Sequence, residues 1–276
     1  MSDQITLLPV SMADLDPVAA LVAAVQWPHR RADIAALIEL GRGRLARASD
    51  GRTLGVGLWW PFSDTAARLG LVVVSPGSQG LGIGRRLVER LLADAAPRPV
   101  MLLATRAGRP LYERLGFVEV GAVCQHQGEY GGERRPDPRI RAATSEDRSA
   151  VLCLDAAVFG IPRPAVLEHL LAVGRAFVLV ENGRVVGYAI ERAFGRGSVV
   201  GPVVAATEPD AIALFNAAAR PGFVRVDRPS EAANFGRHLT ACGLMPDSES
   251  PAMLRGDWPA ATAPQRIYAL VSHALG

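Results

Sequence analysis

The sequence predicts an α/β (α+β) protein made of two similar units, and three observations lead to this prediction. Between residues 69 and 92, an apolar strand, a glycine-rich loop and an amphipathic helix follow one another directly. Strand-like and helical runs alternate on either side of this stretch. After the Gly- and Pro-rich linker candidate 131–138, the same order of runs begins again. A chain of 276 residues, 49% of them hydrophobic, is long enough for two domains.

Local patterns define the elements of the first unit. Ser11 and Asp14 form a helix start of the capping-box type, with Asp in place of the usual Glu. Trp27 and Pro28 end this helix, and the composition of residues 49–52 predicts a hairpin turn. In chain order, we expect strands at 5–9, 45–48, 53–60, 69–74, 100–104 and 117–123, and helices at 15–26, 32–40, 85–92 and 109–115.

The loop at residues 76–84 predicts a phosphate-binding site. A strand that leads through glycines into a helix presents main-chain N–H groups and the positive end of the helix dipole to an anion. A P-loop would need Lys and Ser or Thr after Gly84, where this chain has Arg85 and Arg86. The dinucleotide-binding fingerprint also fails, because Arg85 or Leu87 stands where its third glycine should be.

The run Gln79-Gly80-Leu81-Gly82-Ile83-Gly84, preceded by Val74-Ser75-Pro76, resembles the Q/R-x-x-G-x-G/A acetyl-CoA loop of the GNAT N-acetyltransferase superfamily. The resemblance implies two tandem GNAT-like units, each a mixed, mostly antiparallel twisted sheet flanked by helices. The unit at 1–132 is then catalytic, and the unit at 139–276 is degenerate. It also implies transfer of an acetyl group from acetyl-CoA to a primary amine, on a small molecule or a protein, by direct attack in a ternary complex. The alternative is a non-catalytic acyl-CoA-binding or sensor protein.

The same resemblance assigns candidate site residues. Leu111-Tyr112 followed by Gly116-Phe117 is similar to a second GNAT signature, and it implies that Tyr112 is the general acid that protonates the leaving thiolate. A bulge in the strand before the loop would aim backbone N–H groups, at Val72 and Val74, at the acetyl oxygen. Trp27, Trp59 and Trp60 lie in segments that wall the acceptor site in the family. The expected cofactor-binding residues are Val72, Val73, Val74, Gln79, Gly80, Leu81, Gly82, Ile83, Gly84, Arg85 and Thr105, the last standing where Asn is commonest.

The second unit lacks these features. The hairpin 183–188 parallels 51–56, but no glycine loop follows Val204. Glu208 and Asp210 stand there instead, and two acids at a helix start repel a pyrophosphate. Counting back from Gly243 as from Gly116 places Leu239 at the tyrosine position. We therefore expect one cofactor site per chain, and an apolar tail at 266–275 that packs onto the second domain.

Composition narrows the class of partner. The net charge is +3 and the 30 basic residues, all arginine, are scattered, so nucleic-acid binding is not expected. Three cysteines without a C-x-x-C pair and five isolated histidines predict neither disulfides nor a metal site. No apolar run reaches membrane-spanning length, and the first 16 residues do not resemble a signal peptide. We expect a cytoplasmic monomer or homodimer with no membrane partner.

Overall fold

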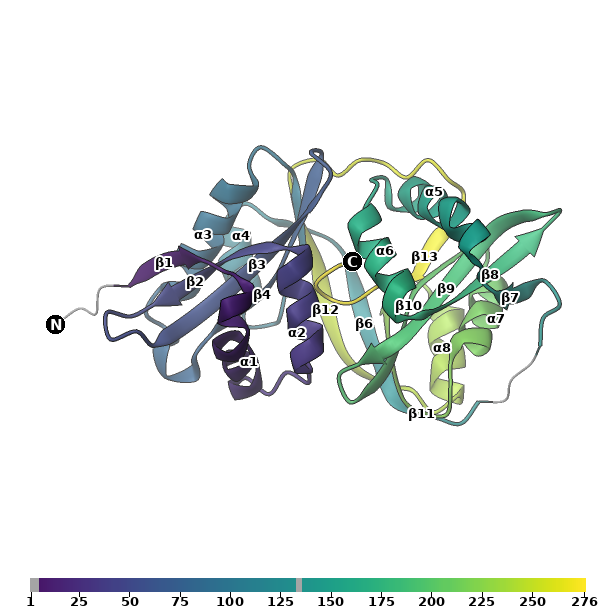
Figure 1. Cartoon of the computed structure of the whole chain (residues 1–276), viewed down its shortest axis with the longest axis horizontal. Coiled ribbons are helices and arrows are strands. Elements are labelled where there is room, and N and C mark those ends of the chain that lie inside the picture. The colour runs from purple at the N-terminus through teal and green to yellow at the C-terminus, as the bar shows by residue number, and fades with distance from the viewer. Residues whose placement is uncertain (1–4, 133–135) are drawn as a thin grey trace.

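A single mixed sheet of 13 strands is found in the computed structural model, which describes residues 5–132 and 136–276 (Figure 1). The sheet is mostly antiparallel, and its parallel pairs among the described strands are β4–β5 and β10–β11. In spatial order the strands are β1 (Thr6–Pro9), β2 (Arg42–Arg47), β3 (Thr53–Phe62), β4 (Ala66–Val74), β5 (Val100–Leu103), β12 (Met245–Arg255), β6 (Val118–Tyr130), β11 (Gly222–Pro229), β10 (Gly197–Ala205), β9 (Arg184–Phe194), β8 (Arg175–Glu181) and β7 (Ile140–Ala142), with β13 (Arg266–Ala269) paired to β10.

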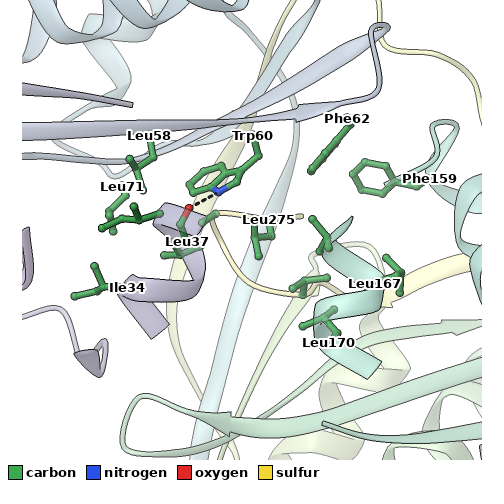
Figure 2. Close-up of a cluster of buried hydrophobic side chains, with 14 of the residues drawn as sticks. Ile34, Leu37, Leu58, Trp60, Phe62, Leu71, Phe159, Leu167, Leu170 and Leu275 are labelled. Carbon is green, nitrogen blue, oxygen red and sulfur yellow. Dashed lines mark hydrogen bonds between the residues drawn. The ribbon is translucent and has the colours of Figure 1, made fainter. Parts of the chain in front are cut away.

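Helices cover both faces of the sheet. They are α1 (Leu15–Ala24), α2 (Arg31–Leu40), α3 (Ile83–Ala95), α4 (Arg109–Arg114), α5 (Arg148–Phe159), α6 (Pro164–Val173), α7 (Glu208–Ala218) and α8 (Ala233–Ala241). On one face α1, α2, α5 and α6 share a single apolar core, in which Trp60 and Leu275 lie between the helices of the two units (Figure 2). On the other face, the core around α3 and α4 is separate from the core around α7 and α8.

The order of elements predicted from the sequence is confirmed in both units. The helix expected at 85–92 is longer at both ends, since α3 already begins at Ile83 and continues to Ala95. The strand expected at 117–123 runs to Tyr130. Within the proposed linker 131–138, residues 133–135 lie outside the described residues.

The two units exchange strands at the centre of the sheet. β12, from the second half of the chain, lies between β5 and β6 of the first half, and pairs with both. β6 in turn pairs with β11 along eight residues, from Val123 opposite Pro229 to Tyr130 opposite Gly222. The sequence predicts two separate sheets, whereas the exchange joins them into one. Each half of the sheet is therefore completed by a strand from the other half of the chain.

Both units begin with the same helix-start device. The Asp14 carboxylate accepts a hydrogen bond from the Ser11 N–H at 3.0 Å, and Asp147 accepts one from the Thr144 N–H at 2.8 Å. Each carboxylate thereby satisfies an N–H group at a helix start. The capping boxes predicted from the two similar motifs are confirmed. No helix within the described ranges is long and apolar enough to cross a membrane.

Candidate active site

The edge of β4 that faces β5 is largely free of sheet partners. β4 pairs with β5 only at Ala67 and Arg68 within the described chain, opposite Val100 and Met101, and the two strands then diverge. Of the next six residues of β4, four (69, 70, 73 and 74) are paired with β3 on the other side, and none of the six has a described strand on this side. A free strand edge offers a row of main-chain N–H and C=O groups to an extended ligand.

A bulge interrupts β4 where the free edge begins. The pairing with β3 shifts by one residue between Val56 and Leu58, so that three steps of β4, from Gly70 to Val73, oppose two steps of β3. Leu71 has φ +48° at this point, a left-handed conformation that is rare for an apolar residue. The bulge expected in this strand is therefore present, and Leu71 is the residue that turns the backbone. Gly70 stands one position earlier, but the residue with the left-handed backbone is a leucine, a residue type that does not indicate such a turn.

The loop after β4 leads its backbone into the first turn of α3. Gly80 and Gly82 have φ of +79° and +77°, and Gly82 is the residue that precedes α3. A Cβ atom at either glycine would meet no other atom within 4 Å, so the left-handed backbone, rather than crowding, favours glycine there. The first N–H groups of an α-helix have no partner inside the helix. A glycine loop followed by a helix start is the kind of backbone that can present N–H groups to an anion.

The other cofactor candidates lie around this turn. The Gln79 side chain donates to the Val74 carbonyl at 3.3 Å and ties the loop back to β4. Arg85 is exposed and paired with Glu89 at 2.7 Å, while Leu81 is 68% exposed. Ile83, by contrast, is buried in the core. Thr105 follows β5, and its hydroxyl accepts a hydrogen bond from the Gly108 N–H at 3.1 Å, just before α4 begins.

Tyr112 lies on α4 in the core on the α3 side of the sheet. Its ring is 7% exposed and contacts Phe117 edge-on, with ring centroids 5.7 Å apart. Burial raises the pKa of the phenol to about 12, so the hydroxyl keeps its proton at neutral pH. No hydrogen-bond partner for this hydroxyl is found within residues 5–132 and 136–276, and the oxygen is not one of the fully buried polar atoms. It therefore remains accessible as a proton donor.

The three tryptophans do not come together. Trp59 points to the α3 side, where Arg42 and Arg98 approach its ring at 5.6 and 5.8 Å. Trp60 points to the opposite face and donates from Nε1 to the Leu37 carbonyl at 3.0 Å (Figure 2). Both are buried core residues. Trp27, half-buried between α1 and α2, packs near His29 with ring centroids 6.0 Å apart, and His29 in turn contacts Phe194 of the second unit.

The corresponding region of the second unit is closed. β10 pairs with β11 at Ser198 and Val199 and then diverges, as β4 does from β5, but β13 fills the gap by pairing with residues 203–205 of β10. The segment after β13 passes so close to Gly201 of β10 that a Cβ atom there would lie 1.9 Å from the Leu270 carbonyl oxygen. The sequence predicted that this tail packs onto the second unit but did not indicate its place in the sheet.

The start of α7 is also occupied by groups of the chain itself, unlike the start of α3. Thr207 precedes the helix and accepts a hydrogen bond from the Asp210 N–H at 3.2 Å, which uses a donor that an anion would need. Glu208 accepts from the Phe235 N–H at 3.1 Å. At the position of Tyr112, Leu239 is fully buried. No group of three or more potential metal-binding side chains is found in the part of the chain that the structure describes.

Comparison with known proteins identifies two domains of the same kind. A family model described as an acetyltransferase (GNAT) domain matches residues 42–119, and a second model with the same description matches residues 151–269. An uncharacterized N-acetyltransferase YitH of Bacillus subtilis is 30% identical over 217 residues, which cover 75% of this chain and 76% of that protein. A mycothiol acetyltransferase of Geodermatophilus obscurus is 33% identical over 104 residues, 37% of this chain and 33% of that protein.

Solved structures share the fold of the whole chain. A putative acetyltransferase from Pyrococcus horikoshii superposes with a TM-score of 0.80 at 19% identity, covering 99% of this chain and 96% of that one. A tandem GNAT protein from the clavulanic acid biosynthesis pathway has a TM-score of 0.65 at 15% identity, covering 91% of this chain and 98% of that one. At these identities the similarity concerns the fold alone.

Proposed function

Because this chain belongs to the GNAT acetyltransferase family, as an enzyme with two GNAT domains in tandem, we propose that it is an acetyl-CoA-dependent N-acetyltransferase with one active unit. The family uses acyl-CoA donors, and acetyl-CoA is the donor that we assign. The first unit, residues 1–132, carries the catalytic residues. The second, residues 139–276, has no cofactor site. The acceptor is a primary amine that attacks the acetyl group directly in a ternary complex.

The observation that carries the proposal is the β4 edge without a described strand partner, followed by the glycine loop and the first turn of α3. We assign the β4 edge at Val72–Val74, which has no described strand partner, to the pantetheine arm, and the N–H groups of residues 80–85 to the pyrophosphate. The start of α3 suits an anionic pyrophosphate because its first turn carries no acidic residue, whereas the first turn of α7 carries two. Bound acetyl-CoA supplies the acetyl group as an activated thioester.

Tyr112 is assigned the role of general acid. Its phenol remains protonated at neutral pH and can give its proton, or a hydrogen bond, to the sulfur that leaves as the amine attacks. The backbone N–H groups of Val72 and Val74, beside the bulge at Leu71, are assigned to stabilise the charge that develops on the acetyl oxygen. This stabilisation comes from main-chain N–H groups and does not depend on the valine side chains. A general base must receive the proton that the attacking amine loses, and we assign no residue to this role.

Binding and turnover test the proposal separately. Calorimetric titrations with acetyl-CoA, and with NAD and ATP as comparison ligands, test the cofactor site. We expect saturable binding of acetyl-CoA alone, with one site per chain. Release of thiol from acetyl-CoA, measured across a panel of primary amines, tests the transfer reaction. Binding without turnover for every amine would instead favour the non-catalytic acyl-CoA-binding or sensor protein.

A further inference from the structure

A pocket lies between the two units on the face opposite Tyr112. Its volume is about 240 Å³, and α2, α6, β9 and the C-terminal tail contribute to it. Most of the lining is apolar. The apolar lining residues include Leu37, Leu40, Leu170, Val173, Phe194 and Leu275. The polar lining consists of Arg30, Asp33, His169, Arg192 and Ser272. A pocket with this lining suits a small apolar molecule that has one polar end.

Arg192 is a buried cation in the lining of this pocket, and no described carboxylate is hydrogen-bonded to it. It is 8% exposed, and its Nη2 atom donates to the Val271 carbonyl at 3.0 Å. Its Nη1 atom is fully buried and has no hydrogen-bond partner among the described residues. Burial lowers the pKa of this guanidinium to about 10, which still leaves it charged at neutral pH. A buried cation without an anionic partner is costly, and binding of an anion removes part of that cost.

The nearby carboxylates are already used by other groups. Asp33 is paired with Arg30 at 2.5 Å and also accepts a hydrogen bond from the Gly195 N–H at 3.0 Å. Asp227, fully buried, is paired with Arg225 at 2.8 Å. Both carboxylates act on the Arg192 charge at longer range, but neither is joined to it in an ion pair of the described residues. The guanidinium donates to the Val271 carbonyl and lies 5.2 Å from the centre of the Phe194 ring.

A second buried arginine adds to the positive charge. Arg68 of β4 is 2% exposed and donates to the His273 carbonyl at 3.0 Å, with no carboxylate partner in the described chain. The tail at 271–274 therefore lies between the guanidinium groups of Arg192 and Arg68. It stabilises both of them through hydrogen bonds to its carbonyl oxygens. Burial lowers the pKa of His169, so this lining residue is neutral at pH 7. The region has an excess of cations over anions.

We propose that the pocket between α2 and α6 binds a small apolar carboxylate, whose carboxylate group pairs with Arg192. The Arg192 guanidinium lines the pocket and has no hydrogen-bonded carboxylate among the described residues, which matches a monoanion, and the apolar walls match a branched or aromatic body. This site does not depend on the proposed function. Its ligand is either the acceptor itself, as an amine that carries a carboxylate, or a regulator that is not acetylated.

Matched carboxylate and amide probes test the site without any turnover. The probes are valine, leucine, methionine and phenylalanine, each with its carboxamide, and the deaminated acid 4-methylpentanoate. Their binding is measured by thermal shift and by calorimetry on the full chain. At least one acid should bind at least tenfold more tightly than its amide, because the acid forms a charge-assisted hydrogen bond. Equal binding of every acid and its amide overturns the proposal.

Arg192→Met removes the charge while keeping most of the volume, and Arg192→Lys keeps the charge. We expect Arg192→Met to lose the preference for the acid while the midpoint of unliganded unfolding stays unchanged or rises, since the cation removed is buried without a hydrogen-bonded carboxylate. Arg192→Lys should recover part of the preference. Arg31→Gln is the control, because Arg31 is 65% exposed at the side chain and lies outside the pocket. Unchanged acid preference in Arg192→Met overturns the assignment of this residue.

Added acetyl-CoA distinguishes the two sources of the ligand. If an amino acid that binds is also consumed, as measured by thiol release, the pocket holds the acceptor. If 4-methylpentanoate and leucine both bind and leucine is not consumed, the pocket holds a regulator. Both outcomes support the site, and neither depends on whether acetyl-CoA binds at the β4 edge.

Discussion

Val203 of β10 and Ala269 of β13 are paired in antiparallel register, on the side of β10 that corresponds to the free side of β4. The two units thus share a diverging pair of parallel strands but differ in what fills the gap. In the second unit a strand of the same chain takes the backbone hydrogen bonds. In the first unit these remain available to a ligand. The asymmetry is therefore in the backbone as well as in the side chains.

This difference predicts that all acetyl-CoA binding depends on the first unit. In Gly84→Asp, the new carboxylate stands in the first turn of α3, where it favours the helix dipole but repels a pyrophosphate. The site has room for a Cβ atom, whose nearest neighbour would be a Val74 methyl at 3.6 Å. We expect the variant to fold normally and to lose the single binding site in calorimetric titration.

Gly84→Ala is the matched control, because it fills the same space without adding charge. Its affinity should stay within a few-fold of the wild-type value. Residual saturable binding in Gly84→Asp, with a stoichiometry near one, would place the site in the second unit and contradict the asymmetry described above.

Tyr112→Phe tests the general acid. The variant keeps the ring in its core position and removes only the hydroxyl, so we expect kcat to fall by about 10²-fold or more while the affinity for acetyl-CoA is preserved. Because burial raises the pKa of the phenol to about 12, no decline in wild-type activity should be traced to Tyr112 between pH 7 and about 10. A variant with wild-type kcat would exclude the hydroxyl from the reaction.

The features that the sequence predicts well are local. Ser11 with Asp14, and Thr144 with Asp147, satisfy helix starts within three residues, and both pairs are found as expected. The glycine loop and α3 also follow from a short continuous pattern. The absence of a glycine loop after Val204 is likewise a local pattern, and it indicated that the helix start of the second unit differs from that of the first.

Features that depend on distant pairing were not predictable in the same way. β6 extends to Tyr130 because β11, about a hundred residues later, pairs with its second half. The position of β13 depends on a free edge that exists only after β10 has diverged from β11. The left-handed backbone at Leu71 is imposed by the register between β3 and β4, and the leucine side chain itself does not indicate it.

A buried ion pair predicts a large cost for one substitution. Asp155 and Arg163 are joined at 2.9 Å with side chains 2% and 0% exposed, and the Tyr188 hydroxyl also donates to Asp155. Asp155→Asn leaves the Arg163 cation buried without its partner, so we expect the free energy of unfolding to fall by about 3–5 kcal/mol. Chemical denaturation measures this change.

An exposed pair provides the control for this measurement. Asp16 and Arg31 are also 2.9 Å apart, but their side chains are 78% and 65% exposed. Asp16→Asn should change the unfolding free energy by less than about 0.5 kcal/mol. A loss of under about 1 kcal/mol in Asp155→Asn would mean that the buried pair is not required for the fold.

His29 predicts how stability depends on pH. Burial, followed by the nearby Arg225 cation, lowers the pKa of this imidazole from 6.5 to about 4, while the opposing Asp33 and Asp227 carboxylates do not restore it. The unfolded chain therefore binds a proton on His29 between pH 6.5 and 4 that the folded chain does not. The stabilisation is fully present above pH 6.5 and is lost as the pH falls toward 4, by up to about 3 kcal/mol. His29→Gln should flatten this acid limb in denaturation curves measured from pH 7 to 4, with a residual slope from His273, whose pKa burial also lowers. An unchanged slope would show that His29 titrates alike in the folded and unfolded chains.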